Sequence, residues 1–275
     1  MSDEHNSETP VEPAPKGSAK AKMMTFASVA HALPFFLWIG IMLLAGMMHL
    51  TPSSGSEDIK SLDLISDAWM YAIRTVLCVV ALCILRPWRY YPALKIKNIL
   101  PAIGVGLAVF VLWVGFETET FKNFAPGLAD LYERYCVDLL HFGEARDFAA
   151  SADKPSPYSP LVCGWPLAII RLLGSALVIA TIEEFFWRGY LLRTIKTPDF
   201  LDLDISYYNP KIFFAVALLF GVNHAEYAVV GAITGVIYGF LYIKTRDIWA
   251  ASIAHITTNF VLGVYVLASG KYYFW

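Results

Sequence analysis

The chain has 275 residues, of which 57% are hydrophobic and only 16% are charged, and its mean hydropathy is +0.53. Soluble domains are about 45–50% apolar and about 25% charged, so this composition argues against a soluble globular enzyme and against a disordered chain. The net charge of −2 provides no basic surface, so nucleic acid is not an expected partner. We therefore expect an all-α, polytopic transmembrane helix bundle embedded in a lipid bilayer.

The chain begins with a polar segment. Residues 1–22 contain three prolines and almost no large aliphatic side chains, which predicts a disordered tail followed by a transmembrane domain at 23–275. The apolar residues that follow form runs long enough to cross a bilayer as helices. Seven spans are predicted, at residues 30–50, 68–85, 99–116, 164–187, 211–230, 231–243 and 248–269. Polar residues interrupt the fifth and sixth, so the expected number is about seven to eight.

The distribution of Lys and Arg predicts the orientation, because cytoplasmic loops carry an excess of both. Thirteen of them fall on the side of the N-terminal tail and six on the other side, which places the N-terminus in the cytoplasm. The long polar segment 117–163 then lies outside. Its apolar spacing at 129–142 predicts an amphipathic helix at the membrane surface. Cys136 and Cys163 lie in or near this segment, where an oxidising compartment would allow them to pair.

Glycines recur four residues apart in the sixth span, at Gly231, Gly235 and Gly239. Small residues at this spacing allow two helices to approach closely within a membrane. The pattern predicts a packing seam, with the sixth span central to the bundle.

Ionisable side chains within three of the later spans are the candidate functional residues. A charge at mid-membrane costs at least about 2.5–3.5 kcal/mol, so such residues are functional candidates by default. They lie in the segments ATIEEFFWRGYLLR, FGVNHAEY and SIAHITTNF, and all fall in a predicted core at about 164–269.

Helix spacing assigns roles to the first of these segments. Glu184 and Arg188 are four residues apart and therefore share a face, where they are expected to form a structural ion pair. Glu183 points about 100° away from that pair and has no counter-ion on its own helix. Such a carboxylate is a candidate general base.

The other two segments supply histidines and an amide. His255 and Asn259 share one helix face, so both can direct donors at a single oxygen, as in an oxyanion hole. His224 comes from a third helix. We therefore expect Glu183 and His224 to hold and deprotonate a water while His255 and Asn259 stabilise a tetrahedral intermediate.

The depths of these residues do not match if every span is straight. His255 lies about 10 Å from its helix end and His224 about 20 Å from its own, at 1.5 Å per residue. The two histidines can reach the same depth only if the fifth span is tilted, starts later or is broken. Gly221 and Asn223 suit a break that lines a cavity.

Three alternatives compete with this interpretation. His224, His255 and Glu183 form a set that can ligate zinc, although there is no HExxH motif and each ligand comes from a separate helix. A non-catalytic immunity or protein-sorting partner would keep the same cavity for binding. A transporter would use the polar residues as a substrate path, but no inverted repeat is evident.

The three motifs together resemble the CPBP family, which contains the type II CAAX prenyl endopeptidases and the bacteriocin-processing or self-immunity proteins. The resemblance covers about 183–259, and its matching residues are Glu183, Glu184 and Arg188, then Phe220 and His224, then His255 and Asn259.

This resemblance implies a glutamate-dependent intramembrane endopeptidase with about eight spans, with Glu184, Arg188 and Phe220 as supporting residues and with no metal or cofactor. It implies a peptide or protein substrate that is lipidated or membrane-anchored, and a bacterial cell membrane as the location. Most relatives are bacterial and bacteria mostly lack protein prenylation, so a prenylated CAAX protein is not the expected substrate. The resemblance also suggests the branch of related proteins associated with exosortase sorting.

Overall fold

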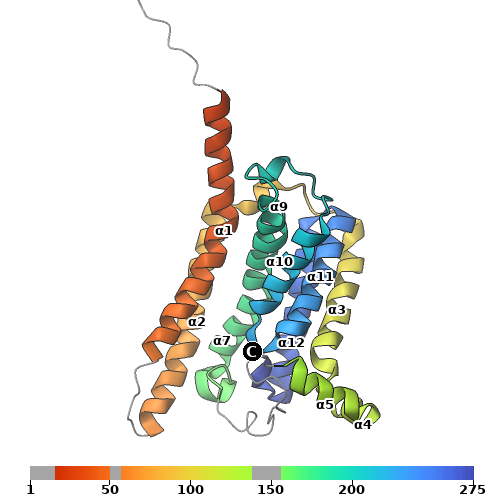
Figure 1. The fold of residues 1–275 in the computed structure, drawn as a ribbon. Coiled ribbons are helices and arrows are strands. Elements are labelled where there is room, and N and C mark those ends of the chain that lie inside the picture. Colours follow the sequence, from red (N-terminus) through yellow and green to blue (C-terminus); the bar gives the residue numbers. More distant parts are fainter. Residues whose placement is uncertain (1–15, 50–56, 138–155) are drawn as a thin grey trace, which may run out of the picture.

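The computed structural model describes residues 16–49, 57–137 and 156–275 (Figure 1). All regular elements in these ranges are helical, which confirms the all-α prediction. Six helices or helical runs are long and apolar enough to cross a membrane, and they cover Lys20–Leu44, Asp67–Tyr90, Ile96–Gly115, Pro160–Thr194, Ala225–Thr245 and Ile248–Ser269. A seventh apolar helix, Pro210–Val222, is shorter. The predicted number of seven to eight spans is therefore approximate.

The longer α-helices are α1 (Lys16–His49), α2 (Glu57–Leu85), α3 (Ile99–Gly115), α5 (Pro126–Tyr135), α7 (Pro160–Leu173), α10 (Pro210–Val222), α11 (Ala228–Thr245) and α12 (Ile248–Ser269). The short ones are α4 (Glu119–Phe124), α8 (Ala180–Glu184) and α9 (Leu192–Thr194). Single turns of 3₁₀-helix are η1 (Pro87–Tyr90), η2 (Ile96–Asn98), η6 (Phe200–Asp202), η7 (Ala225–Tyr227) and η8 (Tyr272–Phe274), and two π-helical segments are η4 (Gly174–Ile179) and η5 (Phe185–Leu191).

The structure describes parts of the N-terminal tail and of the polar segment 117–163. Helix α1 begins at Lys16, inside the predicted tail, and residues 1–15 lie outside the described residues. The amphipathic helix expected at 129–142 is represented by α5, and residues 138–155 again lie outside the described part. Cys136 and Cys163 are both free thiols, so the disulfide considered from the sequence is not formed.

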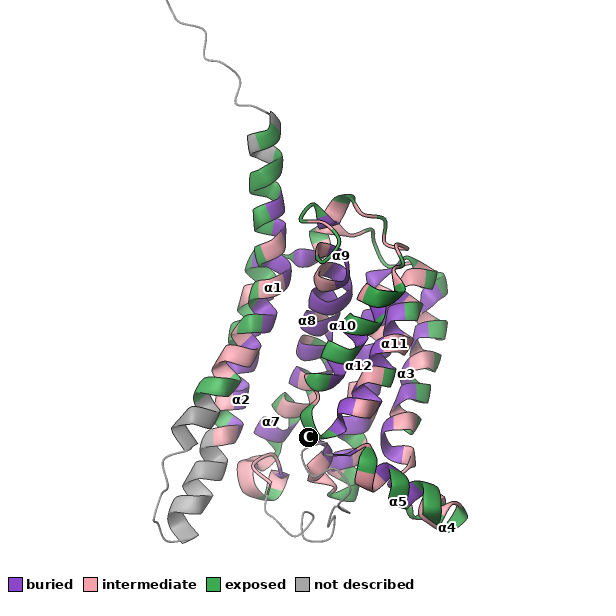
Figure 2. Cartoon of the chain, viewed as in Figure 1, coloured by how far each residue is buried: buried purple, intermediate pink, exposed green. Residues whose placement is uncertain are grey.

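The helices pack as an antiparallel bundle whose two ends differ (Figure 1). Helices α1 and α2 form a hairpin at one side, α2 packs on α7, and α3 packs on α12. The N-terminal end of α1 and the connection between α9 and α10 lie at one end of the bundle, whereas α5 and the C-terminus lie toward the other. Buried residues line the interior of the bundle and exposed residues lie on its outside (Figure 2). Many of the exposed residues are large and apolar, as expected where lipid surrounds a bundle.

The glycine seam predicted in the sixth span is confirmed, and it joins α11 to α10. A Cβ added to Gly235 would lie 2.9 Å from the carbonyl oxygen of Ala217, and one added to Gly239 would lie 2.7 Å from the ring of Phe213. A Cβ on Gly231 would lie 3.1 Å from Gly221 Cα. The two backbones therefore approach too closely for larger side chains, as small-residue motifs allow.

The boundary between the fifth and sixth spans differs from the prediction. The sequence predicts a boundary between residues 230 and 231, but α10 ends at Val222 and α11 starts at Ala228. Helix α10 has 13 residues and is about 20 Å long at 1.5 Å per residue, which is less than the roughly 30 Å hydrocarbon core. The chain therefore reverses inside the bundle, at the break that Gly221 and Asn223 suggested.

A buried polar cluster joins α1 to the end of α9. His31 Nδ1 donates to the Ala27 carbonyl at 2.6 Å, so its Nε2 accepts from Tyr91 Oη at 2.9 Å. Arg193 Nη2 donates to the same phenol oxygen at 2.8 Å. Burial raises the pKa of Tyr91, which therefore stays neutral.

Candidate active site

The fourth helical run carries both glutamates between two irregular turns. It extends over Pro160–Thr194, and the α-helical turn α8 that contains Glu183 and Glu184 is flanked by the π-helical segments η4 and η5. Segments of π-helix are rare and frequently mark functional sites, because they rotate the side chains that follow them. Both glutamates are buried.

Glu184 is the centre of a buried polar network. Its Oε1 accepts from Arg188 Nη1 at 2.7 Å and from His255 Nδ1 at 2.9 Å. Arg188 also donates from Nη2 to the Gly235 carbonyl at 3.1 Å, on the glycine seam. The Glu184–Arg188 pair predicted from the i, i+4 spacing is therefore present, and it also joins α12 and α11.

Phe220 packs against the members of this network. The Arg188 guanidinium lies 4.4 Å from the centre of its ring, and the rings of His224 and His255 lie at 4.6 and 5.8 Å. A buried cation above an aromatic face is stabilised by the ring quadrupole. The Phe220 ring therefore packs against three polar side chains and helps to keep them in place.

Glu183 faces the other way and has only weak partners. Asn223 Nδ2 donates to Oε1 at 3.3 Å. Oε2 is buried and accepts no hydrogen bond from the described residues, and His255 Nε2 lies 3.9 Å from it. A gap of 3.9 Å is too long for a direct hydrogen bond and short enough for one water to contact both atoms.

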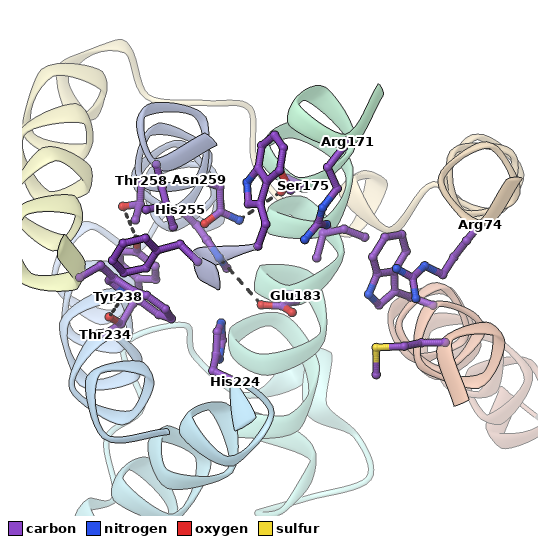
Figure 3. A pocket seen from close by; sticks show the side chains of 17 residues that line it. Arg74, Arg171, Ser175, Glu183, His224, Thr234, Tyr238, His255, Thr258 and Asn259 are labelled. Carbon is purple, nitrogen blue, oxygen red and sulfur yellow. Dashed lines mark hydrogen bonds and ion pairs between the residues drawn. The ribbon is translucent and has the colours of Figure 1, made fainter. Parts of the chain in front are cut away.

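His224 follows the break after α10. Its Nδ1 donates to the Phe220 carbonyl at 2.7 Å, which leaves Nε2 as the acceptor of a neutral ring. The ring also lies edge-on to Trp113 with 5.5 Å between centres. In Figure 3 the ring extends into the same space as Glu183.

Asn259 lies one helical turn after His255, as the spacing predicted. Its Nδ2 donates to the Ser175 carbonyl at 3.1 Å, so one of its two amide hydrogens is bound to the backbone of η4. The other hydrogen and the amide oxygen remain for a ligand. His255 Nε2 can donate only when both ring nitrogens carry a proton, because Nδ1–H is directed at Glu184.

A cavity of about 240 Å³ brings the predicted residues together (Figure 3). All four residues predicted to be catalytic, namely Glu183, His224, His255 and Asn259, line it. The three predicted supporting residues, Glu184, Arg188 and Phe220, are not among its lining residues and lie behind it. The cavity also extends to Phe274 and Trp275, which follow the end of α12.

Several lining residues were not predicted. Arg74 on α2 and Arg171 on α7 both face the cavity, as do the hydrogen-bonded pairs Trp113–Thr234 and Tyr238–Thr258. The two arginines carry a signal that the sequence does contain, because a cation within an apolar span is itself a functional candidate. The two pairs carry no such signal, since their residue types are common in any helix.

The zinc set considered from the sequence is not assembled. Across residues 16–49, 57–137 and 156–275, no group of three or more His, Cys, Asp and Glu side chains is arranged to hold a metal ion.

Comparison with known proteins confirms the predicted resemblance. Residues 165–261, about a third of the chain, match the family described as Rce1-like, type II CAAX prenyl endopeptidase Rce1-like. The matched segment runs from α7 to α12 and contains every residue of the three motifs. No curated protein and no solved structure gives a significant match. The match indicates a membrane protease similar to CAAX endopeptidases and does not extend to the exosortase-associated branch.

Proposed function

We propose that the protein hydrolyses a peptide bond within the membrane by means of a water that Glu183 activates. The observation that supports this most directly is the position of the Glu183 Oε2 atom, which is buried at the cavity and accepts no hydrogen bond from the described side chains. A carboxylate oxygen in that position can accept a proton from water, a contribution of about 10²–10⁴-fold for a general base.

The neighbouring residues have complementary roles in this proposal. The free Nε2 of His224 accepts the second hydrogen bond of the water. Asn259, together with His255 in its doubly protonated form, donates to the oxygen on which charge develops when the water adds to the peptide carbonyl. The proton held by Glu183 then passes to the leaving amine. Glu184 orients His255 through Nδ1, and no serine or cysteine nucleophile is required.

The peptide reaches this site from the outer side of the membrane. Lys and Arg are in excess at the end of the bundle that holds the start of α1, and such an excess is typical of the cytoplasmic side. The cavity extends the opposite way, toward Phe274 and Trp275. A substrate anchored in the bilayer, with a lipid or with a helix of its own, would present its cleavage site at this depth.

Cleavage of a candidate membrane-anchored substrate tests the mechanism. Glu183→Gln and His224→Ala are compared with Glu226→Gln, which changes an exposed carboxylate two residues after His224 that does not line the cavity. We expect turnover to fall by about 10²–10⁴-fold in the first two variants and to be retained in the control. Turnover near the wild-type rate in both Glu183→Gln and His224→Ala would overturn the mechanism.

A further inference from the structure

Two arginines line the cavity without a counter-ion of their own. Arg74 is 9% exposed, and the Nε atoms of both Arg74 and Arg171 are buried without a hydrogen-bond partner. Neither side chain has a carboxylate partner among the residues that the structure describes. Two unpaired guanidinium groups in a membrane span are costly, and they are normally paired or face a substrate path.

Aromatic rings, and not acids, hold these guanidinium groups. Arg74 Cζ lies 3.7 Å from the centre of the Trp38 ring, and Arg171 Cζ lies 4.7 Å from that of Tyr158. Both groups also lie beside the Tyr71 ring, at 5.1 and 4.4 Å. Aromatic faces stabilise the cations and leave their N–H groups available for an anion.

The two arginines lie at one level of the bundle. Tyr71 Oη, three residues before Arg74, donates to the Arg171 carbonyl at 3.3 Å, which fixes α2 against α7 at this height. Figure 3 shows both arginine side chains on the same side of the cavity, beyond Glu183.

One helix face connects the arginines to the candidate base. Arg171, Ser175, Ile179 and Glu183 follow one another at four-residue intervals, and all four line the cavity. Twelve residues of α-helix are about 18 Å long, and this run is somewhat shorter because it includes the π-helical segment η4. An extended peptide covers this length with about five residues, at 3.3–3.6 Å each.

We infer that Arg74 and Arg171 form a binding site for the C-terminal carboxylate of the substrate, about five residues beyond the bond that is cleaved. The inference rests on the proposed function, because it assigns the far end of the same cavity. A carboxylate pairs with guanidinium groups through charge-assisted and often bidentate hydrogen bonds, which would occupy the free N–H groups. The site would select short C-terminal segments over longer ones.

Peptide binding to the full-length chain tests this inference without requiring cleavage. The Glu183→Gln protein is placed in phosphatidylcholine nanodiscs and titrated with a dansylated ten-residue peptide of Leu, Ala and Val. The peptide is used once as the free acid and once as the C-terminal amide. Energy transfer from tryptophan to dansyl reports the Kd. We expect the acid to bind at least about tenfold more tightly than the amide.

Arginine variants test whether Arg74 and Arg171 cause the preference for the free acid. In Arg74→Gln/Arg171→Gln the preference for the acid should disappear while the Kd of the amide stays the same, which also shows that the cavity is intact. Arg74→Lys/Arg171→Lys should keep part of the preference. The control Arg134→Gln, a partly exposed arginine on α5 paired with Asp130, should keep all of it.

Two results would overturn the inference. The first is equal binding of acid and amide, and the second is an acid preference that persists in the double Gln variant. A lipid phosphate is the other anion that could occupy the arginine site. A parallel titration in nanodiscs that contain phosphatidylglycerol, an anionic lipid, tests this alternative. If acid and amide bind equally and phosphatidylglycerol weakens both, but only when the arginines are present, a lipid phosphate occupies the site and the carboxylate proposal is wrong. If the wild-type chain does not cleave but the acid preference holds, the mechanism fails and the carboxylate site stands.

Discussion

His255 Nδ1 donates to Glu184 Oε1 at 2.9 Å, and this bond links two helices across 71 residues of sequence. The same carboxylate oxygen accepts from Arg188, so one oxygen connects a cation and an imidazole. The other ring nitrogen of His255 is thereby directed toward Glu183, at 3.9 Å. The adjacent glutamates therefore differ in their surroundings: Glu184 lies inside a buried hydrogen-bond network, and Glu183 faces the cavity.

Loss of the Glu184 carboxylate should destabilise the fold. In Glu184→Ala the buried Arg188 has no counter-ion, and breaking a buried pair in this way costs about 3–5 kcal/mol. We expect a clearly lower midpoint of thermal unfolding in detergent, whereas Glu226→Ala, at an exposed position, should lower it much less. In Glu184→Met/Arg188→Met both charges are removed, and much of the stability should return. A wild-type midpoint in Glu184→Ala would contradict the architectural role.

Glu183 should show the opposite behaviour. Its carboxylate is buried with one hydrogen bond, at 3.3 Å, so the neutral amide of Glu183→Gln costs less to bury. We expect an unfolding midpoint equal to or above that of the wild type, together with the loss of turnover described above. A midpoint as low as that of Glu184→Ala would mean that Glu183 also holds the bundle together.

Asn259 is expected to act on the rate and not on substrate binding. Removal of one oxyanion donor typically lowers kcat about 10²–10³-fold, with little change in KM when the contact forms only in the transition state. Asn259→Ala also removes the bond to the Ser175 carbonyl, at a cost of about 1 kcal/mol in stability. Asn259→Asp retains the shape but not the N–H donors, and should lose a similar factor in kcat. A raised KM with unchanged kcat would show that Asn259 contacts the bound substrate only.

Patterns within one helix were predictable from the sequence, because helix geometry determines which residues share a face. The Glu184–Arg188 pair, the adjacency of His255 and Asn259, and the glycine seam at Gly231 all follow from spacings of four. These patterns do not encode the rotation of one helix against another. The contact between Glu184 and His255 therefore became visible only in three dimensions.

The break between α10 and α11 was predictable only in part. A depth mismatch required the fifth span to tilt, start late or break, but hydropathy does not separate these possibilities because residues 211–230 are apolar on both sides of His224. Packing decides it. The turn after Val222 is stabilised where the His224 ring packs on Trp113, which lies on a different helix. For the same reason the arginine pair was missed: Arg74 and Arg171 lie 97 positions apart, and only the packing of α2 on α7 brings them together.

The close approach of the backbones at this break predicts that alanine at Gly221 destabilises the fold, whereas alanine at Gly104 does not. A Cβ on Gly221 would overlap the Ala228 carbonyl oxygen, so Gly221→Ala must displace the turn that carries His224. We expect a stability loss of about 1–3 kcal/mol and reduced turnover. Gly104→Ala is the matched control, because a Cβ there meets nothing within 4 Å and alanine favours helix by about 1 kcal/mol. Equal unfolding midpoints in the two variants would contradict the packing at the break.

The orientation of the bundle can be tested by labelling from outside the cell. Lys196 is exposed after α9 at the end that holds the start of α1, and Gly127 is exposed on α5 at the other end (Figure 1). In a background where Cys83, Cys136 and Cys163 are serine, a membrane-impermeant maleimide should label Gly127→Cys on intact cells. It should label Lys196→Cys only after lysis, because the excess of Lys and Arg predicts a cytoplasmic location for that end of the bundle. The reverse pattern would place the cavity mouth on the cytoplasmic side, and the substrate would then have to be a cytoplasmic peptide.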